Sequence, residues 1–375
     1  MKLCLLPVLA LAFAFAARGA EVPPPPVAAH AWLLMDVTSG QTLGAVNATE
    51  RLEPASLTKL MTAYLVFEAL KEKRLSLEQN VPVSERAWKA GGSRMFIQPR
   101  LPVTVDELLQ GVIVDSGNDA CIALAEAVAG TEEAFAEHMN REAKRLGMAN
   151  THFTNASGLP DPAHYTTAQD LATLAAALIR DFPEYYPRYY SQKEYRYNNI
   201  TQPNRNRLLW LDPNVDGVKT GHTEAAGYCL IASARRDKRR VLSVLLGASS
   251  EASRAQESQK LLNFAFLNYD DVPLYSAGKP VSELPVWKGS ARRLKAGVAS
   301  DLYVSVPRGM GDKLKAELVS QQPLLAPVQA GQRVGTIKVA LEGKPLAEYP
   351  AVAMETVGVA GPFGRAIDTV RLWLK

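Results

Sequence analysis

The sequence predicts an α+β protein in which helices pack on an antiparallel sheet and a smaller β-rich domain follows. Helical segments predominate up to about residue 270 and surround two adjacent strand-like runs. After Asp271 the helical periodicity fades, and short β-like runs alternate with Gly and Pro. The length of 375 residues also exceeds the usual size of one domain. We therefore expect a first domain over residues 27–270 and a β-rich domain over residues 271–357.

The composition is that of an ordinary globular protein, with 47% hydrophobic and 21% charged residues. The formal net charge is only +4, and Lys2 and Arg18 near the N-terminus contribute two of the positive charges. A nucleic-acid-binding protein normally has a much larger basic excess. The sequence therefore argues against nucleic acid as a partner.

Cysteine and histidine give no basis for a disulfide framework or a metal site. Apart from Cys4 near the N-terminus, the chain has only Cys121 and Cys229. Cys121 lies in an apolar helical run, so we expect a buried, unreactive thiol there. The five histidines have no clustered partners at metal-ligand spacing. We expect no metal and no cofactor.

Residues 1–20 have the features of a secretory signal peptide. Lys2 provides the positive end, the residues up to Ala17 are apolar, and the small residues up to Ala20 suit cleavage near position 19 or 20. The apolar run is shorter than the ~20 residues that cross a bilayer. A buried first helix and an uncleaved anchor are the alternatives, and the stiff Pro23–Pro26 segment makes both less favourable. We expect the mature protein to work outside the cytoplasm.

The first domain should begin with a hairpin and continue with helices. Residues 30–36 and 41–46 are predicted strands around a Ser39-Gly40 turn. A helix should start near Pro54-Ala55-Ser56, with Ser as its cap. Because residues 60–70 are apolar almost all round, this helix should lie in the centre of the domain. Further helices are predicted at residues 107–114, 119–128, 132–146, 168–180 and 254–267.

Two adjacent antiparallel strands are predicted near the end of the first domain, at residues 227–234 and 241–247. The basic run 235–239 between them is interpreted as a solvated hairpin end. The Tyr-rich run 185–197 is interpreted as packed or surface aromatic side chains rather than as a glycan site. In the second domain, strands are predicted at residues 302–306, 333–339 and 347–353.

The last residues, 362–375, form a separate amphipathic pattern. Apolar side chains gather on one helical face, namely Phe363, Ala366, Ile367, Val370, Trp373 and Leu374. A short helix of this kind suits the plane of a membrane surface, and docking on the protein itself is the alternative. The Gly358–Gly364 stretch separates the segment from the β-rich domain, which favours the membrane. The segment is too short to span a bilayer.

Three short strings contain the groups of a serine acyl-transfer site whose base is a lysine. They are Ser56-Leu57-Thr58-Lys59, Ser116-Gly117-Asn118 and Lys219-Thr220-Gly221. Each string alone is common and has a structural alternative: a capping serine with a surface lysine, a loop connector, or a turn into a strand. The three together, in this order, are far more specific.

Ser56 and Lys59 lie three positions apart on one predicted helix, so their side chains rise from the same face. A serine hydroxyl needs a base to take its proton, and a lysine can serve only as a neutral amine. Burial in an apolar helix and a nearby cation both favour that neutral form. Lys219, if folded beside Lys59, would be such a cation.

The other two strings supply substrate contacts. Ser116 could relay a proton to a departing amine, and Asn118 offers a donor and an acceptor to a substrate amide. On an edge strand, Lys219 and Thr220 can bind a carboxylate. Gly221 leaves room for a peptide that pairs with the strand edge.

With these strings the chain resembles the D-alanyl-D-alanine carboxypeptidases, low-molecular-mass penicillin-binding proteins of the type tethered to the inner membrane of Gram-negative bacteria. The resemblance covers nearly the whole mature chain. It rests on the segments 54–59, 116–120, 204–206 and 215–222 and on the C-terminal amphipathic tail. It implies a penicilloyl-serine-transferase (β-lactamase-like) domain, a small sandwich-like β domain, and a periplasmic enzyme held peripherally at the inner membrane.

The resemblance also implies the reaction and its catalytic residues. The family removes the terminal D-Ala from peptidoglycan pentapeptide stems, and β-lactams acylate the same serine. By the motif match, Ser56 would be the nucleophile, Lys59 its base and Ser116 the proton relay. The segment 153–165 matches only loosely, so no deacylation role is assigned to it.

The implied binding residues surround the same serine. Asn118 would hold the substrate amide, and the backbone N–H groups of Ser56 and His222 would form the oxyanion hole. The carboxylate would meet Lys219 and Thr220. Arg205 and Arg254 are further candidates for that contact.

Three other functions remain open from the sequence. A DD-endopeptidase would use the same site on cross-linked stems. A class A β-lactamase shares two of the strings but needs a glutamate that activates water, and residues 151–170 contain none. A non-catalytic wall-binding protein would have no use for intact Ser56, Lys59, Asn118 and Lys219.

Overall fold

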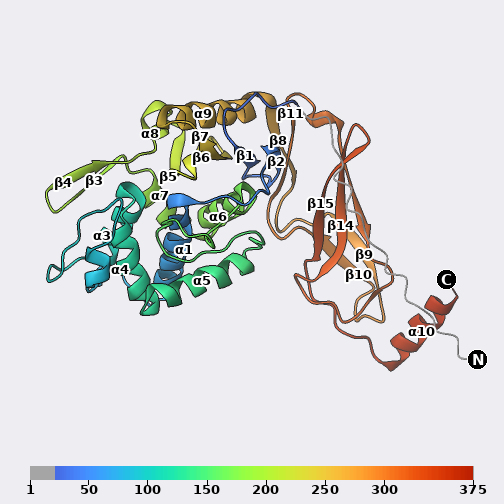
Figure 1. The fold of residues 1–375 in the computed structure, drawn as a ribbon. Helices are drawn as coiled ribbons and strands as arrows, with labels where there is room; N and C mark the ends of the chain where they lie inside the picture. Colours follow the sequence, from blue (N-terminus) through green and yellow to red (C-terminus); the bar gives the residue numbers. More distant parts are fainter. Residues whose placement is uncertain (1–21, 375) are drawn as a thin grey trace, which may run out of the picture. The chain divides into compact units, whose positions relative to one another are not determined.

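The computed structural model describes residues 22–374, so the expected signal peptide at residues 1–20 lies outside the described chain. The chain divides into two compact units, one over Pro24–Asn268 and one that contains Tyr269–Lys375. Figure 1 shows helices packed around a sheet in the first unit and mostly strands in the second. The predicted α+β class is confirmed.

A five-stranded antiparallel sheet forms the frame of the first unit, in the order β2-β1-β7-β6-β5. Its strands are β1 (Ala31–Asp36), β2 (Thr42–Val46), β5 (Val215–Thr223), β6 (Gly227–Arg236) and β7 (Arg239–Ala248). The string Lys219-Thr220-Gly221 therefore lies on an edge strand, as predicted. Its outer side is open to pairing with a peptide.

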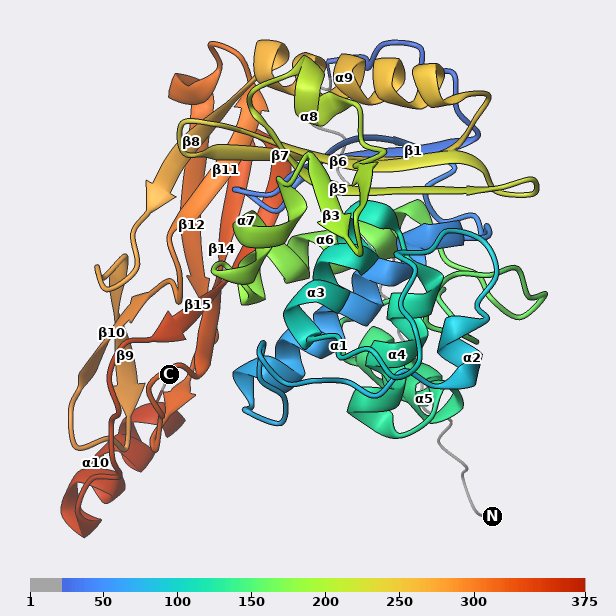
Figure 2. The ribbon, with the colours of Figure 1, turned by 90° about the vertical axis from the view of Figure 1, so that its left-hand side faces the viewer.

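Helices cover both faces of this sheet (Figure 2). On one face lies α9 (Glu251–Asn268), and on the other lies the cluster that contains α1 (Lys59–Lys71) and α6 (Ala168–Asp181). Eleven of the thirteen residues of α1 are buried, which confirms its predicted central position. The cluster is completed by α2 (Glu85–Trp88), α3 (Val105–Gln110), the π-helical turn η2 (Gly111–Asp115), α4 (Asn118–Ala129), α5 (Glu132–Arg145) and α7 (Tyr185–Tyr190).

Short elements that the sequence analysis missed connect these helices to the edge strand. They are the hairpin of β3 (Glu194–Tyr197) with β4 (Ile200–Pro203) and the single turn α8 (Leu208–Leu211). The Tyr-rich run belongs to the core at Tyr186, Tyr189 and Tyr190, which are all buried. The interpretation of this run as packed aromatics is confirmed.

One local prediction is wrong. Ser56 does not cap a helix, because the chain enters α1 through a 3₁₀ turn, η1 (Ala55–Thr58), without a side-chain cap. The basic run 235–239 forms a hairpin end, as predicted, with Arg235, Asp237 and Lys238 exposed. The strands continue until Arg236 pairs with Arg239, and the Arg239 guanidinium lies 2.7 Å from the buried carboxylate of Asp36.

The second unit is built from two β layers. β8 (Tyr269–Tyr275) pairs with β11 (Leu302–Pro307), and their apolar side chains pack against the larger sheet. That sheet has the order β12-β14-β15-β10-β9-β13. Its strands are β9 (Ser282–Trp287), β10 (Arg293–Gly297), β12 (Leu314–Ser320), β13 (Leu324–Leu325), β14 (Arg333–Leu341) and β15 (Lys344–Ala353), with a 3₁₀ turn η3 (Gly311–Lys313) before β12.

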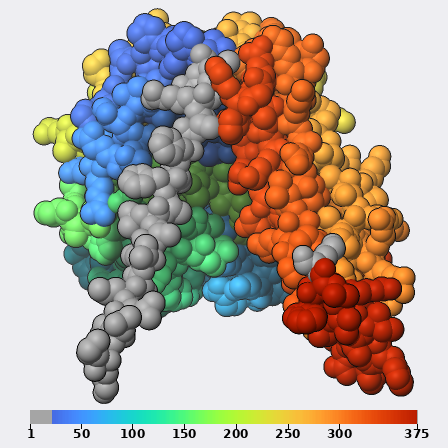
Figure 3. All heavy atoms as spheres, turned by 90° about the vertical axis from the view of Figure 1, so that its right-hand side faces the viewer, coloured from blue at the N-terminus to red at the C-terminus, as the bar shows by residue number. Residues whose placement is uncertain are grey.

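The predicted C-terminal helix is present as α10 (Pro362–Trp373), at one end of this unit (Figure 3, dark red). Its apolar face is open to solvent: Phe363 is 88% and Trp373 is 87% exposed. The Asp368 carboxylate on the helix accepts the backbone N–H of Lys288 at 2.7 Å. Across residues 22–374, no helix has both the length and the hydropathy that a bilayer crossing requires.

Candidate active site

Ser56 and Lys59 meet at the start of the central helix. Lys59 is the first residue of α1 and is 1% exposed, and Ser56 lies in the 3₁₀ turn just before it. The Lys59 Nζ lies 2.9 Å from the Ser56 Oγ. The predicted contact between the two side chains is therefore present.

Two carbonyl oxygens complete the surroundings of the Lys59 amine. Its Nζ donates to the Asn118 Oδ1 at 2.7 Å and to the Ser157 backbone oxygen at 2.7 Å. A carbonyl oxygen can only accept, so each of these contacts needs an N–H. A neutral amine has two N–H groups and one lone pair. An ammonium also donates to the Ser56 hydroxyl, whereas a neutral amine with both N–H groups used in this way has its lone pair left for that hydroxyl.

Electrostatics shift the Lys59 amine toward this neutral form. The pKa of Lys59 is lowered to about 8, chiefly by burial and in smaller part by the positive charge of Arg205. Lys219, the cation expected beside it, is buried as well. Burial first, and then the charges of Lys59 and Arg205, hold the pKa of Lys219 well below its usual range.

Ser116 joins the two lysines to one site. It follows the π-helical turn η2 with a φ of 61°, a left-handed conformation that is uncommon for residues other than glycine. The Lys219 Nζ donates to the Ser116 Oγ at 3.0 Å and to the Thr220 backbone oxygen at 2.9 Å. The turn thus brings Ser116-Gly117-Asn118 into contact with Lys219-Thr220-Gly221.

A loop that the sequence analysis did not single out fixes this turn. The Asp119 carboxylate accepts the backbone N–H groups of Met95, Phe96 and Ile97. The Asn118 side-chain amide donates to the Gly91 backbone oxygen at 2.7 Å, which leaves its Oδ1 directed to Lys59. In the sequence, the only indication of this contact with the loop is the carboxylate of Asp119, which directly follows Ser-Gly-Asn.

The Ser157 carbonyl, which accepts a hydrogen bond from Lys59, is the second part of the site that the sequence analysis missed. The Asn155 side chain holds this loop by accepting the backbone N–H groups of Ser157, Gly158 and Leu159. Gly158 has a φ of +83°, and a Cβ there would overlap the backbone carbonyl of Ala55. The Asn-Ala-Ser-Gly sequence is typical of a side-chain-stabilised turn, but nothing in it identifies Lys59 as the partner.

A polar cavity of about 290 Å³ opens beside Ser56. Its walls contain seven of the predicted site residues, together with Ser93, Tyr228 and Glu251; the seven are Ser56, Ser116, Arg205, Thr220, Gly221, His222 and Arg254. Lys59 and Lys219 lie buried behind this wall and touch it through Ser56 and Ser116, and Asn118 is buried against Lys59. The structure therefore brings every predicted site residue to one place.

Gly221 also makes a close contact within the protein that the sequence analysis did not predict. A Cβ at Gly221 would lie 3.2 Å from the Ser56 backbone nitrogen and 3.2 Å from the Pro54 carbonyl. The missing side chain thus lets β5 approach the turn that carries Ser56. The His222 ring stacks near Tyr228, with ring centres 4.1 Å apart.

The two candidate arginines differ in their surroundings. Arg205 is exposed, and its guanidinium donates to the Ser93 hydroxyl at 2.8 Å. Arg254 is buried, and it donates to the backbone oxygens of Gly221 and Arg205 at 3.4 Å. Burial lowers the pKa of Arg254. Both positive charges lie at the wall of the cavity formed by β5.

Comparison with known proteins agrees with this geometry. Residues 18–250 match the family "D-alanyl-D-alanine carboxypeptidase", and residues 269–359 match "Penicillin-binding protein 5, C-terminal domain". The chain is 45% identical over 367 residues to the D-alanyl-D-alanine carboxypeptidase DacC of Escherichia coli (strain K12). That alignment covers 96% of this chain and 91% of DacC.

Solved structures give the same assignment. Penicillin-binding protein 5 from Haemophilus influenzae superposes with a TM-score of 0.85 at 42% identity, covering 90% of this chain and 99% of that one. Penicillin-binding protein D2 from Listeria monocytogenes, in its cefotaxime-bound form, gives a TM-score of 0.60 at 32% identity, covering 65% of this chain and 100% of that one. The chain belongs to the D-alanyl-D-alanine carboxypeptidase family of serine peptidases and has a C-terminal domain of the penicillin-binding protein 5 type.

Proposed function

We propose that this chain, a serine-type D-Ala-D-Ala carboxypeptidase, removes the terminal D-Ala from the pentapeptide stems of peptidoglycan through an acyl-enzyme on Ser56. The observation that carries the proposal is the set of contacts around Lys59. Two carbonyl oxygens accept its N–H groups, and the remaining position faces the Ser56 hydroxyl. An amine held in this way is prepared to take a proton from that hydroxyl.

In acylation, the Ser56 oxygen attacks the carbonyl of the penultimate D-Ala as Lys59 takes its proton. The backbone N–H groups of Ser56 and His222 stabilise the oxyanion that develops. Breaking the amide bond requires a proton on the departing nitrogen, and Ser116 delivers it with Lys219 behind it. Water then attacks the ester on Ser56 and releases the shortened stem.

Substrate is held at both sides of the reacting bond. Asn118 contacts the stem's amide, and the edge of β5 at Thr220 and Gly221 pairs with its backbone. The terminal carboxylate meets Lys219 and Thr220, and the positive wall of Arg205 and Arg254 attracts it. β-Lactams carry a carboxylate next to a reactive amide and should acylate Ser56 in the same way.

The β-lactamase alternative is less well supported. Within residues 22–374, the hydrogen-bond partners of Lys59 are a hydroxyl, an amide oxygen and the Ser157 carbonyl, with no carboxylate among them. A class A enzyme uses a glutamate to activate the deacylating water. The loop that reaches Lys59 here supplies a backbone oxygen instead. We therefore expect long-lived penicilloyl-enzyme.

We also propose where the protein works. Residues 1–20 direct its export, a catalytic domain spans residues 27–270 and a β-rich domain spans residues 271–357. The helix at residues 362–375 lies on the inner-membrane surface from the periplasmic side. The support is the exposed apolar face of α10, which bears Phe363 and Trp373.

The experiment is mass spectrometry of the mature protein after exposure to benzylpenicillin, combined with an assay of D-Ala release from a pentapeptide stem. We expect a single penicilloyl adduct on Ser56, and the release of one D-Ala from each pentapeptide stem that is cleaved. An adduct on another side chain, or rapid turnover of penicillin without D-Ala release, would contradict the proposal.

A further inference from the structure

His164 is a buried histidine beside the turn that carries Ser56 and Lys59, and the mechanism above gives it no part. It lies between α5 and α6 and is 3% exposed. Its Nε2 lies 2.8 Å from the Oγ1 of Thr58, the residue directly before Lys59. Its Nδ1 lies 3.1 Å from the backbone nitrogen of Thr154, in the loop that leads to Ser157. The imidazole therefore bridges the start of the central helix and this loop.

The two contacts determine which nitrogen of the ring carries the proton. The backbone N–H of Thr154 can only donate, so the Nδ1 of His164 accepts and is unprotonated. In the neutral ring the proton is then on Nε2, which donates to the Thr58 hydroxyl. A ring protonated on both nitrogens would lose the bond to Thr154. The bridge therefore requires neutral His164.

The bridge closes a circuit of hydrogen bonds that passes through Lys59. Thr154 is followed by Asn155, whose side chain accepts the backbone N–H of Ser157 at 3.2 Å. The Ser157 carbonyl in turn accepts from the Lys59 Nζ at 2.7 Å. Because Thr58 adjoins Lys59, the His164 ring lies across the circuit from the amine. Its two bonds restrict how far the Ser157 carbonyl can move from Lys59.

The loop also has anchors that do not involve His164. The Thr62 hydroxyl on α1 donates to the Ala156 backbone oxygen at 2.6 Å, and the Glu132 carboxylate on α5 accepts the Ala156 N–H at 3.0 Å. These contacts should hold the loop against the helices in variants without the His164 bonds. The loss is then confined to the stretch next to Lys59.

We propose that His164 is a positioning residue, which ties the Ser157 loop to the Lys59 turn and so keeps the base oriented and shielded from water. The inference rests on the proposed role of Lys59 in acylation. Within residues 22–374, the hydrogen bonds of the His164 ring go to Thr58, Thr154 and Asn155. Its effect on the reaction therefore passes through Lys59.

Loss of the bridge should change the pKa of Lys59. Burial is the largest cause that lowers this pKa, to about 8. Without the bonds of His164, water reaches the Lys59 amine more readily, and its pKa rises toward that of an ordinary lysine. Less of the amine is then neutral at pH 7, whereas at high pH it is neutral in either case.

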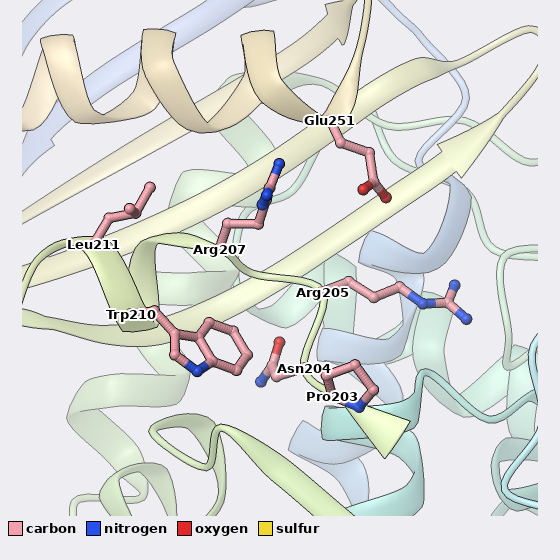
Figure 4. Close-up of a pocket in the computed structure, with 7 residues that line it drawn as sticks. All are labelled: Pro203, Asn204, Arg205, Arg207, Trp210, Leu211 and Glu251. Atoms are coloured by element: carbon pink, nitrogen blue, oxygen red, sulfur yellow. The ribbon is translucent and has the colours of Figure 1, made fainter. Parts of the chain in front are cut away.

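Other titrations do not account for such a change. The groups that face Lys59 lie on other elements and stay in place when His164 is replaced; they are Asp119 and Cys121 on α4, Lys219 on β5, and Arg205 between β4 and α8 (Figure 4). Asp161 and His152 face His164, and burial lowers the pKa of His164 to about 4. His164 is therefore neutral throughout the range above about pH 6.

The experiment compares the pH dependence of acylation in the full mature protein and two variants. His164→Phe keeps a ring against Phe153, whose centre lies 5.6 Å away, but has neither nitrogen. His164→Gln keeps a donor that can reach Thr58. His152→Phe is the matched control, because His152 lies in the same segment and its Nδ1 contacts the Ala163 backbone oxygen, outside the circuit. The measurement is the second-order rate constant for labelling by fluorescent penicillin between pH 6 and 9.5, with thermal melting to confirm the fold.

We expect His164→Phe to label about tenfold more slowly than the wild type at pH 7 but within about threefold at pH 9.5. The midpoint of its profile should move from about pH 8 to about pH 9. His164→Gln should have a midpoint between the two, and His152→Phe should match the wild type.

A merely structural role of His164 would lower the rate by the same factor at every pH, or lower only the melting temperature. Either result, or an unchanged midpoint in both variants, would overturn the inference and leave the proposed function intact. If His164→Phe does not fold, the midpoint of His164→Gln decides the question. A wild-type protein that is not labelled at any pH would instead refute the proposed function itself.

Discussion

The Lys219 amine lies 3.0 Å from the Ser116 hydroxyl, although 103 positions separate the two residues in the chain. With the Lys59–Ser56 contact, the site has two pairs of a buried amine and a hydroxyl. In the proposed mechanism, the Ser56–Lys59 pair supplies the activated nucleophile, and the Ser116–Lys219 pair protonates the leaving amine. Burial of both amines lowers both pKa values, so each gives up its proton more readily than an ordinary lysine.

Removal of the nucleophile or its base should abolish acylation. Ser56→Ala should give no labelled band with fluorescent penicillin, and Lys59→Ala should slow labelling by about a thousandfold. Circular dichroism should show that both variants retain the fold. Lys260→Ala is the control, because Lys260 is an exposed lysine that pairs with Glu257 away from the site. Labelling of Ser56→Ala at the wild-type rate would refute the assignment.

Acylation should depend on pH through Lys59. Its pKa is lowered to about 8, and the base is the deprotonated form, so the rate should rise with pH and level off above about 8. At pH 7 about a tenth of the amine is neutral. The measurement is the second-order rate constant for penicillin labelling between pH 6 and 9.5. A rate that is flat over this range would mean that Lys59 does not act as the base.

Gly158 should be needed for both stability and activity. Gly158→Ala places a side chain on the Ala55 carbonyl, and its φ of +83° adds strain. Gly147→Ala is the matched control, since Gly147 has a φ of +82° and open space around its Cβ position. We expect the control to lose about 1 kcal/mol of stability. Gly158→Ala should lose at least about 2 kcal/mol more and should label slowly.

Those two effects can be measured separately, by thermal melting and by the rate of penicillin labelling. Gly147→Ala should label as fast as the wild type, because its strain lies away from Ser56. Equal melting temperatures and labelling rates in the two variants would show that the close approach of Gly158 to Ala55 has no role.

Membrane attachment should depend on the apolar face of α10. Deleting residues 362–375 should move the protein from the membrane pellet to the soluble fraction, and Phe363→Ser with Trp373→Ser should do so in large part. Leu325→Ser is a suitable control, because Leu325 is 47% exposed on β13. Fractionation followed by penicillin labelling measures both location and fold. A truncated protein that still pellets with membranes would contradict the proposed role of the helix.

Several features follow from the sequence because they depend on local geometry. A spacing of three on a helix or 3₁₀ turn places Ser56 and Lys59 side by side whatever surrounds them. The apolar character of residues 60–70 makes α1 a central helix, since almost all of its surface is apolar and is buried on folding. Residues 227–234 and 241–247 are two apolar runs on either side of a short polar turn, so they likewise predict a neighbouring antiparallel pair.

Other features were decided only by the tertiary structure. The two carbonyl groups that accept from Lys59 belong to Asn118 and Ser157, which lie 59 and 98 positions further along the chain. The neighbouring cation, Arg205, comes from another segment. Arg239 at the end of the hairpin donates to Asp36 across 203 positions, a contact that the local sequence does not indicate. The sequence therefore determines which groups are available and which pairs are neighbours along one element. How many N–H groups of Lys59 are occupied, and hence where its lone pair points, depends on loops whose closure is a property of the whole fold.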